Sequence, residues 1–68
     1  MKSAAEVDGW KVLIEQPSGL RKNYHVEASD TVWGKFAETF GATPTEALER
    51  LAVRTGIDRV ELLQMFGL

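Results

Sequence analysis

The feature that most constrains this fold is a pair of short segments in which apolar and polar residues alternate. Every second residue is apolar from Trp10 to Ile14 and again from Tyr24 to Ala28, and a Pro17-Ser18-Gly19 turn signal lies between the two segments. Because successive side chains of a strand point to opposite faces, this pattern predicts a β-hairpin with one buried face. A lone hairpin is only marginally stable in water, so its apolar face must pack on helices.

A first helix is predicted directly after the hairpin. Asp30 or Thr31 suits its N-cap, and Val32, Phe36 and Phe40 recur at four-residue spacing. That spacing is typical of an apolar helical stripe facing a core. We therefore expect a helix that begins at residue 30 or 31 and ends near residue 40.

Two further helices are predicted from their capping signals. Thr43 suits an N-cap, Pro44 the first helical position, and Glu46 can complete a capping box. Gly56 then suits the helix end. A short third helix is expected from Arg59 to about Phe66.

The expected architecture is thus an α+β domain with the element order ββααα, in which the last two helices form a helix-turn-helix-like pair. Residues 1–8 are polar and small, so we expect a flexible N-terminus followed by a single small domain over residues 9–68. A chain of 68 residues without cysteine lies near the lower size limit for an unaided core. A partner protein or a second copy would add buried surface.

Charge and residue types argue against several functional classes. The net charge of −2 is not that of a general polyanion binder. His25 is the only histidine and cysteine is absent, so we expect no metal and no cofactor. No segment reaches the ~20 apolar residues of a membrane span, and the N-terminus lacks the apolar core of a signal peptide. We therefore expect a cytoplasmic protein without a membrane partner.

Catalysis is also not expected. His25 and Glu27 lie two apart on one strand, so they can touch, but no activated nucleophile accompanies them. The domain is too small to enclose a drug-sized pocket, so we expect no small-molecule substrate. We predict a binding module rather than an enzyme.

The C-terminal helix pair has the spacing of a helix-turn-helix. Ala52 precedes Gly56 by four residues, and Ile57, Leu62 and Met65 fall where the helices must pack together. Residues 36–66 resemble the DNA-binding part of tetracycline-repressor-like proteins. The matching pieces are Phe36-Ala37-Glu38, Leu51-Ala52, Arg54, Gly56-Ile57 and Phe66-Gly67. The resemblance implies DNA binding and transcription regulation.

The predicted DNA-binding residues come from two places. Arg59 and Gln64 on the third helix are suited to reading base edges. The hairpin adds a basic patch of Arg21, Lys22, Asn23, His25 and Lys11. The order of elements is also similar to that of ribbon-helix-helix repressors, in which the strand with Arg21, Asn23 and His25 would read DNA. A solvated hairpin face is the alternative interpretation of this patch.

A protein-interaction module is the second functional class that the sequence leaves open. Val60 and Leu63 lie away from the expected buried side of the third helix, and Leu13 adds an apolar side chain on the outer hairpin face. An exposed apolar surface of this kind would bind a partner protein, as in an inhibitor, an adaptor or an antitoxin, or a second copy in a homodimer. If Val60 and Leu63 are exposed in the structure, they favour an interface; if they are buried, they belong to the core.

Overall fold

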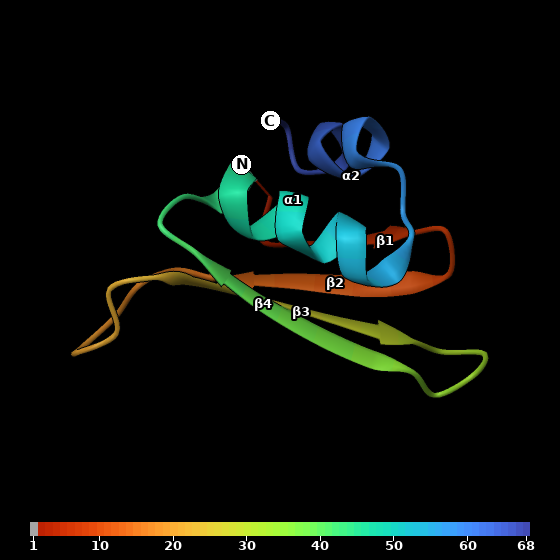
Figure 1. The fold of residues 1–68 in the computed structure, drawn as a ribbon, viewed down its shortest axis with the longest axis horizontal. Coiled ribbons are helices and arrows are strands. Elements are labelled where there is room, and N and C mark those ends of the chain that lie inside the picture. The colour runs from red at the N-terminus through yellow and green to blue at the C-terminus, as the bar shows by residue number, and fades with distance from the viewer. Residues whose placement is uncertain (1) are drawn as a thin grey trace.

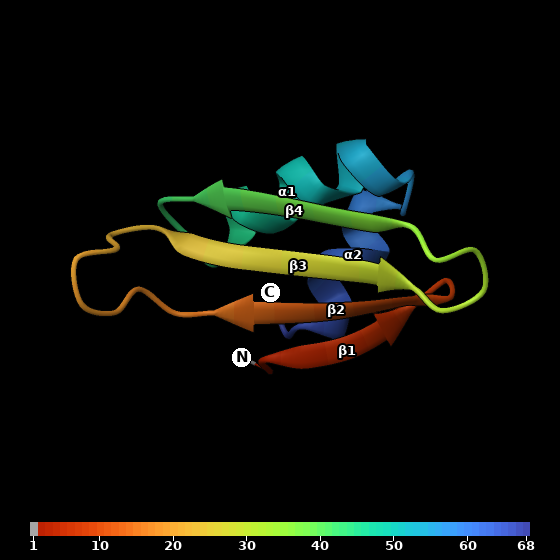
Figure 2. The same ribbon diagram turned by 90° about the horizontal axis from the view of Figure 1, so that it is seen from below.

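The computed structural model describes residues 2–68, which form a four-stranded antiparallel sheet with two helices on one face (Figure 1). The strands pair in chain order, and they are β1 (Ala4–Val7), β2 (Trp10–Glu15), β3 (Tyr24–Asp30) and β4 (Phe36–Gly41). The helices are α1 (Pro44–Thr55) and α2 (Arg59–Met65). Figure 2 shows the sheet from the side opposite the helices, with β1 and β4 at its edges. No helix within residues 2–68 is long and apolar enough to cross a membrane.

The N-terminal residues form a strand of this sheet. β1 lies within the segment that we expected to be flexible, and it pairs with β2 through a two-residue turn at Asp8-Gly9. Both turn residues have positive φ, 51° at Asp8 and 82° at Gly9, as a type I′ hairpin turn requires. Val7 at the end of β1 is buried in the core. The Asp-Gly pair is therefore a hairpin signal that the sequence prediction overlooked.

The helix expected over residues 30–40 is a strand instead, so the predicted ββααα order is wrong and the observed order is ββββαα. Asp30 does not cap a helix; its Oδ1 accepts hydrogen bonds from the backbone N–H groups of Val32 and Trp33 within a turn. Gly34 follows with a φ of 70°, outside the helical region. Asp30, which we expected to cap a helix, thus stabilises the turn that joins β3 to β4.

Small residues on β4 allow α1 to pack closely on the sheet. Thr39 and Gly41 are buried on the face toward α1, and the Thr39 hydroxyl donates a hydrogen bond to the Ala47 carbonyl, 2.7 Å away. A Cβ at Gly41 would lie 2.6 Å from the backbone nitrogen of Ala47. The large side chains of Phe36 and Phe40 therefore point away from the core, and their four-residue spacing imitates a helical stripe.

The helix ends follow the capping signals. Thr43 accepts a hydrogen bond from the N–H of Glu46 at the start of α1, and Gly56 ends α1 with a φ of 79°. Asp58 caps α2 in the same way, through the N–H of Glu61. These boundaries confirm the predictions for the second and third helices. α1 packs on β3 and β4, whereas α2 packs on α1 and β1.

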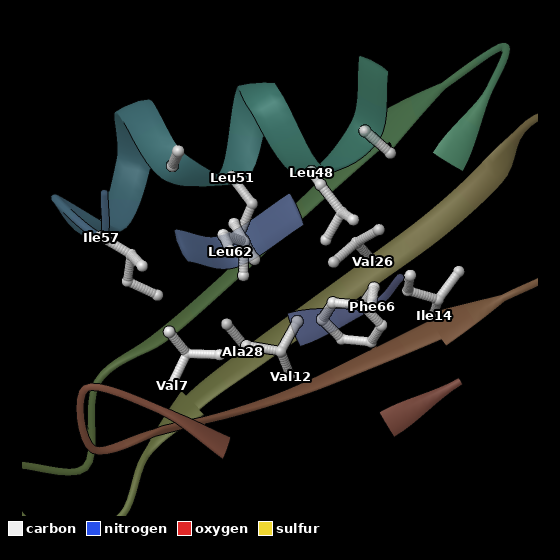
Figure 3. Packing of buried hydrophobic residues seen from close by; sticks show 12 residues of the cluster. Val7, Val12, Ile14, Val26, Ala28, Leu48, Leu51, Ile57, Leu62 and Phe66 are labelled. Atoms are coloured by element: carbon white, nitrogen blue, oxygen red, sulfur yellow. The ribbon is translucent and has the colours of Figure 1, made fainter. Parts of the chain in front are cut away.

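A single core lies between the sheet and the helices (Figure 3). Its buried members are Val7, Val12, Ile14, Val26, Ala28, Ala47, Leu48, Leu51, Ala52, Ile57, Leu62 and Phe66. Phe66, just after α2, reaches the sheet near Ile14 and is fully buried. Because every helix contact lies on this side, the opposite face of the sheet is left uncovered within the described residues.

Candidate functional site

The uncovered face of the sheet carries a mixture of carboxylates and large apolar side chains. The strand register places Glu15 opposite His25 and His25 opposite Phe40. The same alternation places Leu13, Glu27, Phe36 and Glu38 on this face as well. Phe36 is 61% exposed and Phe40 is 43% exposed, unlike the aliphatic residues on the helix side. We call this surface the open face.

His25 lies at the centre of a carboxylate cluster on the open face. Its Nδ1 is 2.9 Å from Glu15 Oε1 and 3.8 Å from Glu27 Oε1, and its Nε2 is 2.9 Å from Glu38 Oε2. The imidazole stacks on Phe40 with ring centroids 4.6 Å apart. These contacts leave His25 only 7% exposed. We call Glu15, His25, Glu27 and Glu38 the His25 cluster.

The contacts within the cluster shift the pKa values of His25 and Glu15. Burial opposes the charged form of His25, but hydrogen bonds to Glu15 and Glu38 and the charge of Glu27 outweigh it. The pKa of His25 is therefore raised above its ordinary value. The hydrogen bond to His25 lowers the pKa of Glu15, and Arg21, whose guanidinium lies 3.8 Å from this carboxylate, lowers it further.

The outer edge of β4 presents free backbone groups. The Asp30 N–H donates to the Lys35 carbonyl at 2.8 Å, so the backbone groups of Lys35 face β3. In an antiparallel pair, every second residue turns its N–H and C=O toward the partner strand. The N–H and C=O groups of Phe36, Glu38 and Phe40 therefore point away from β3. Consistent with this, Arg50 Nη1 donates to the Phe40 carbonyl from outside the sheet, at 2.7 Å.

A groove of about 590 Å³ lies between this edge and α1. It is lined by Glu38, Thr39, Phe40, Arg50, Val53 and Arg54. Arg50 also pairs with Glu46 at 2.9 Å, whereas no carboxylate of residues 2–68 lies within ion-pair distance of Arg54. Val53 is 87% exposed. We call this feature the β4 groove, and it combines open backbone groups, two guanidinium groups and exposed apolar surface.

The DNA-binding residues predicted on the third helix lie on α2 but do not share one face. Arg59 and Gln64 are both exposed. They are five positions apart, which is about 140° around an α-helix. The Arg59 guanidinium donates to the Glu49 carboxylate of α1. The structure therefore does not bring these two side chains together.

The hairpin residues predicted to bind DNA are also separated. Lys22 and Asn23 are exposed in the β2–β3 loop, next to Arg21, which donates to the Gln16 carbonyl. Lys11 pairs with Ser29, four residues along β2 from the Glu15–His25 pair. That distance is about 13 Å along the sheet. His25 itself is enclosed by carboxylates, so the predicted basic patch does not form a continuous surface.

The apolar strip predicted for protein binding is divided between two faces. Val60 on α2 is 53% exposed, but Leu63 is partly buried against the core. Leu13 is 40% exposed on the open face, on the far side of the sheet from α2. Val60 alone thus keeps the exposure that we expected of an interface on the third helix.

Sequence reasoning missed the β4 groove and two members of the His25 cluster. The neighbours His25 and Glu27 were predicted to touch, and they do so at 3.8 Å. Glu15 could have been found from the register of the β2–β3 hairpin. Glu38 could not have been found, because it belongs to the strand that was expected to be a helix.

No protein-family model, curated protein or solved structure matches this chain. Its function is therefore inferred from the geometry of its own residues.

Proposed function

We propose that this chain is a non-catalytic protein-interaction module that binds an extended acidic segment of a partner protein along β4. The observation that carries this proposal is the open edge of β4 beside the β4 groove. An extended peptide can pair with such an edge as an additional strand, with main-chain hydrogen bonds supplying affinity and alternate side chains supplying specificity.

The backbone of β4 offers donors and acceptors where the peptide would lie. Phe36 and Glu38 direct their N–H and C=O groups outward, and Arg50 caps the Phe40 carbonyl at the end of this stretch. α1 runs back along β4 (Figure 1), and Val53 and Arg54 line the groove together with Glu38. A short strand paired with residues 36–38 would therefore contact α1 on one side and the open face on the other.

The two sides of the added strand would meet different chemistry. Side chains toward α1 would meet the guanidinium groups of Arg50 and Arg54, which favour carboxylates. Side chains toward the open face would meet the rings of Phe36 and Phe40, which favour apolar residues. A segment in which acidic and apolar residues alternate fits both sides.

A second copy of this chain fits the edge less well. A symmetric antiparallel pairing centred on Glu38 would place Glu38 opposite Glu38 of the other copy, and it would need the Phe40 carbonyl to which Arg50 already donates. Like charges directly opposite each other destabilise a strand pair. This register therefore disfavours a homodimer, whereas the guanidinium groups of Arg50 and Arg54 favour a partner with acidic side chains toward α1.

DNA binding through the C-terminal helix pair stays a prediction with less support. Arg59 is engaged by Glu49, and the carboxylates of the His25 cluster would repel phosphates near the hairpin. Binding of duplex DNA at low salt, weakened by Arg59→Ala, would favour it. A cytoplasmic location likewise remains part of the proposal.

The proposal is tested with two ten-residue peptides in which valine alternates with glutamate or with lysine. The glutamate peptide should bind and the lysine peptide should not, as measured by fluorescence anisotropy. Arg54→Glu should weaken binding of the glutamate peptide by at least about tenfold, because it reverses the charge that faces the peptide. Lys22→Glu is the matched control, since it makes the same charge change at an exposed position of the β2–β3 loop that does not line the groove.

Three results would contradict the proposal. One is equal binding of the two peptides, and another is an equal loss of affinity in the Arg54 and Lys22 variants. The third is a dimer of the free protein in sedimentation equilibrium that Glu38→Lys disrupts, because this would assign the β4 edge to a second copy.

A further inference from the structure

The His25 cluster has the geometry of a metal site, although the single histidine led us to expect none. Glu15, His25 and Glu27 each offer one ligand atom, and these three atoms all lie within 4.8 Å of one another. Ligand atoms around a tetrahedral ion with bonds near 2.1 Å are about 3.4 Å apart. The separations of 2.9 Å and 3.8 Å from His25 Nδ1 to the two carboxylates lie on either side of that value.

The two nitrogens of His25 have different surroundings. Two carboxylates, from Glu15 and Glu27, face Nδ1, whereas Glu38 alone faces Nε2. A neutral imidazole has one N–H, so it can donate to Glu38 from Nε2 while Nδ1 presents its lone pair to an ion. A carboxylate that accepts from the second nitrogen is the usual support of a metal-bound histidine.

The ring is already held in place for this role. It is nine-tenths buried, it stacks on Phe40, and it is fixed from the Nε2 side by Glu38. Its two proposed co-ligands come from adjacent strands, because Glu15 is its cross-strand partner and Glu27 follows it by two residues on β3. A rigid sheet therefore presents all three ligand atoms on one face.

Charge balance also favours a divalent ion over a proton at Nδ1. The carboxylates of Glu15, Glu27 and Glu38 carry three negative charges, and Arg21 beside Glu15 offsets one. A protonated His25 leaves the group with one negative charge, whereas a neutral His25 with a divalent ion leaves it neutral. A nitrogen donor with two carboxylates suits Zn²⁺ rather than Mg²⁺ or Ca²⁺, which prefer oxygen ligands.

We infer that Glu15, His25 and Glu27 bind a single Zn²⁺ ion on the open face, with Glu38 as the positioning residue. Three protein ligands leave a fourth position of the ion to water or to a side chain of a bound partner. The three ligands lie on β2 and β3, outside the β4 groove, although Glu38 also lines that groove. The inference does not depend on the proposed peptide binding, so either can fail alone.

The test is a titration of the purified, chelator-treated protein with Zn²⁺ at neutral pH, in which binding is measured by isothermal titration calorimetry. One ion should bind per chain. Glu27→Gln should lower the affinity at least tenfold, and Glu38→Gln should lower it by about 10- to 100-fold through loss of the positioning carboxylate. Glu6→Gln removes a carboxylate from the same face but outside the cluster, and it should leave the affinity unchanged.

A second readout needs no variant. In nitrogen NMR spectra of the wild-type imidazole, Zn²⁺ should shift Nδ1 of His25 while Nε2 stays protonated. The inference is overturned if excess Zn²⁺ leaves the His25 resonances unchanged. Weak binding of several ions, reduced equally by Glu6→Gln and Glu27→Gln, would also overturn it, because this would reveal only general attraction to surface carboxylates.

Discussion

His25 ties three strands together through its side chain. Its hydrogen bonds reach Glu15 on β2 and Glu38 on β4 from its own place on β3. Without a metal ion, both bonds to carboxylates require a proton on each ring nitrogen. The strength of this link therefore depends on pH.

The direction of the pH effect is set by the raised pKa of His25. The folded protein holds the proton more tightly than the unfolded chain, so protonation stabilises the fold fully below the ordinary histidine pKa. This contribution is lost as pH rises through the raised pKa. With a chelator present, the free energy of unfolding in urea should fall from pH 6 to pH 8.5.

His25→Gln should remove most of that pH dependence. Glu15 acts in the opposite range, since its lowered pKa gives a contribution that is lost only in acid. A wild-type stability that is flat or rising between pH 6 and pH 8.5 would contradict the role given to His25.

Gly41 is a second position where one residue decides the packing. A Cβ there would lie 2.6 Å from a backbone atom of α1, which cannot move aside as a flexible side chain can. Gly41→Ala should therefore destabilise the protein by about 3 kcal/mol, at the upper end for overpacking. Thermal unfolding would show this as a loss of roughly 12–24 °C in Tm.

Gly19→Ala provides the comparison, because a Cβ at Gly19 meets no atom within 4 Å and only its φ of 59° opposes the change. Its cost should be about 1–2 kcal/mol, the cost of the left-handed conformation for an L-residue. Equal stabilities of the two variants would show that α1 does not approach β4 as closely as described.

At the scale of elements, the parts with strong local signals were predictable and β4 was not. The β2–β3 hairpin and the caps at Thr43, Gly56 and Asp58 appear in the structure where the sequence places them. β1 could have been predicted from Asp8-Gly9. The sequence of β4 does not look like that of a strand, because its inward residues are small, to fit α1, and its aromatic residues face outward.

The same strand explains what was missed in the candidate site. Glu38 and the β4 groove both depend on residues 36–41 being extended at the sheet edge. Local spacing favoured a helix there, and only pairing with β3, which is a tertiary contact, determines the outcome. A site built on a misassigned element cannot be recovered from the pattern alone.

The cap of α1 makes an element-scale prediction. The Thr43 hydroxyl accepts a hydrogen bond from the Glu46 N–H at 3.1 Å, and α1 carries one wall of the β4 groove. Thr43→Ala should lower the free energy of unfolding by about 1 kcal/mol, whereas Thr43→Ser should retain most of it. Chemical denaturation monitored by circular dichroism measures both, and an unchanged stability of the alanine variant would show that this cap contributes nothing.

At the scale of the whole molecule, the two helices and the two proposed sites occupy different parts of the sheet. The helices occupy one face of the sheet (Figures 1 and 2). The His25 cluster lies on the opposite face, and the β4 groove lies at one edge. The surface opposite the helices is thus free to carry function without loss of core packing.

Amide hydrogen exchange along β4, measured by NMR with and without the valine–glutamate peptide, tests the central claim most directly. In the free protein, the N–H groups of Ala37, Thr39 and Gly41 should exchange slowly and those of Phe36 and Glu38 quickly, since only the first set bonds β3. With the peptide bound, Phe36 and Glu38 should also become slow. Unchanged exchange at these two amides, or protection that appears on α2 instead, would contradict the account.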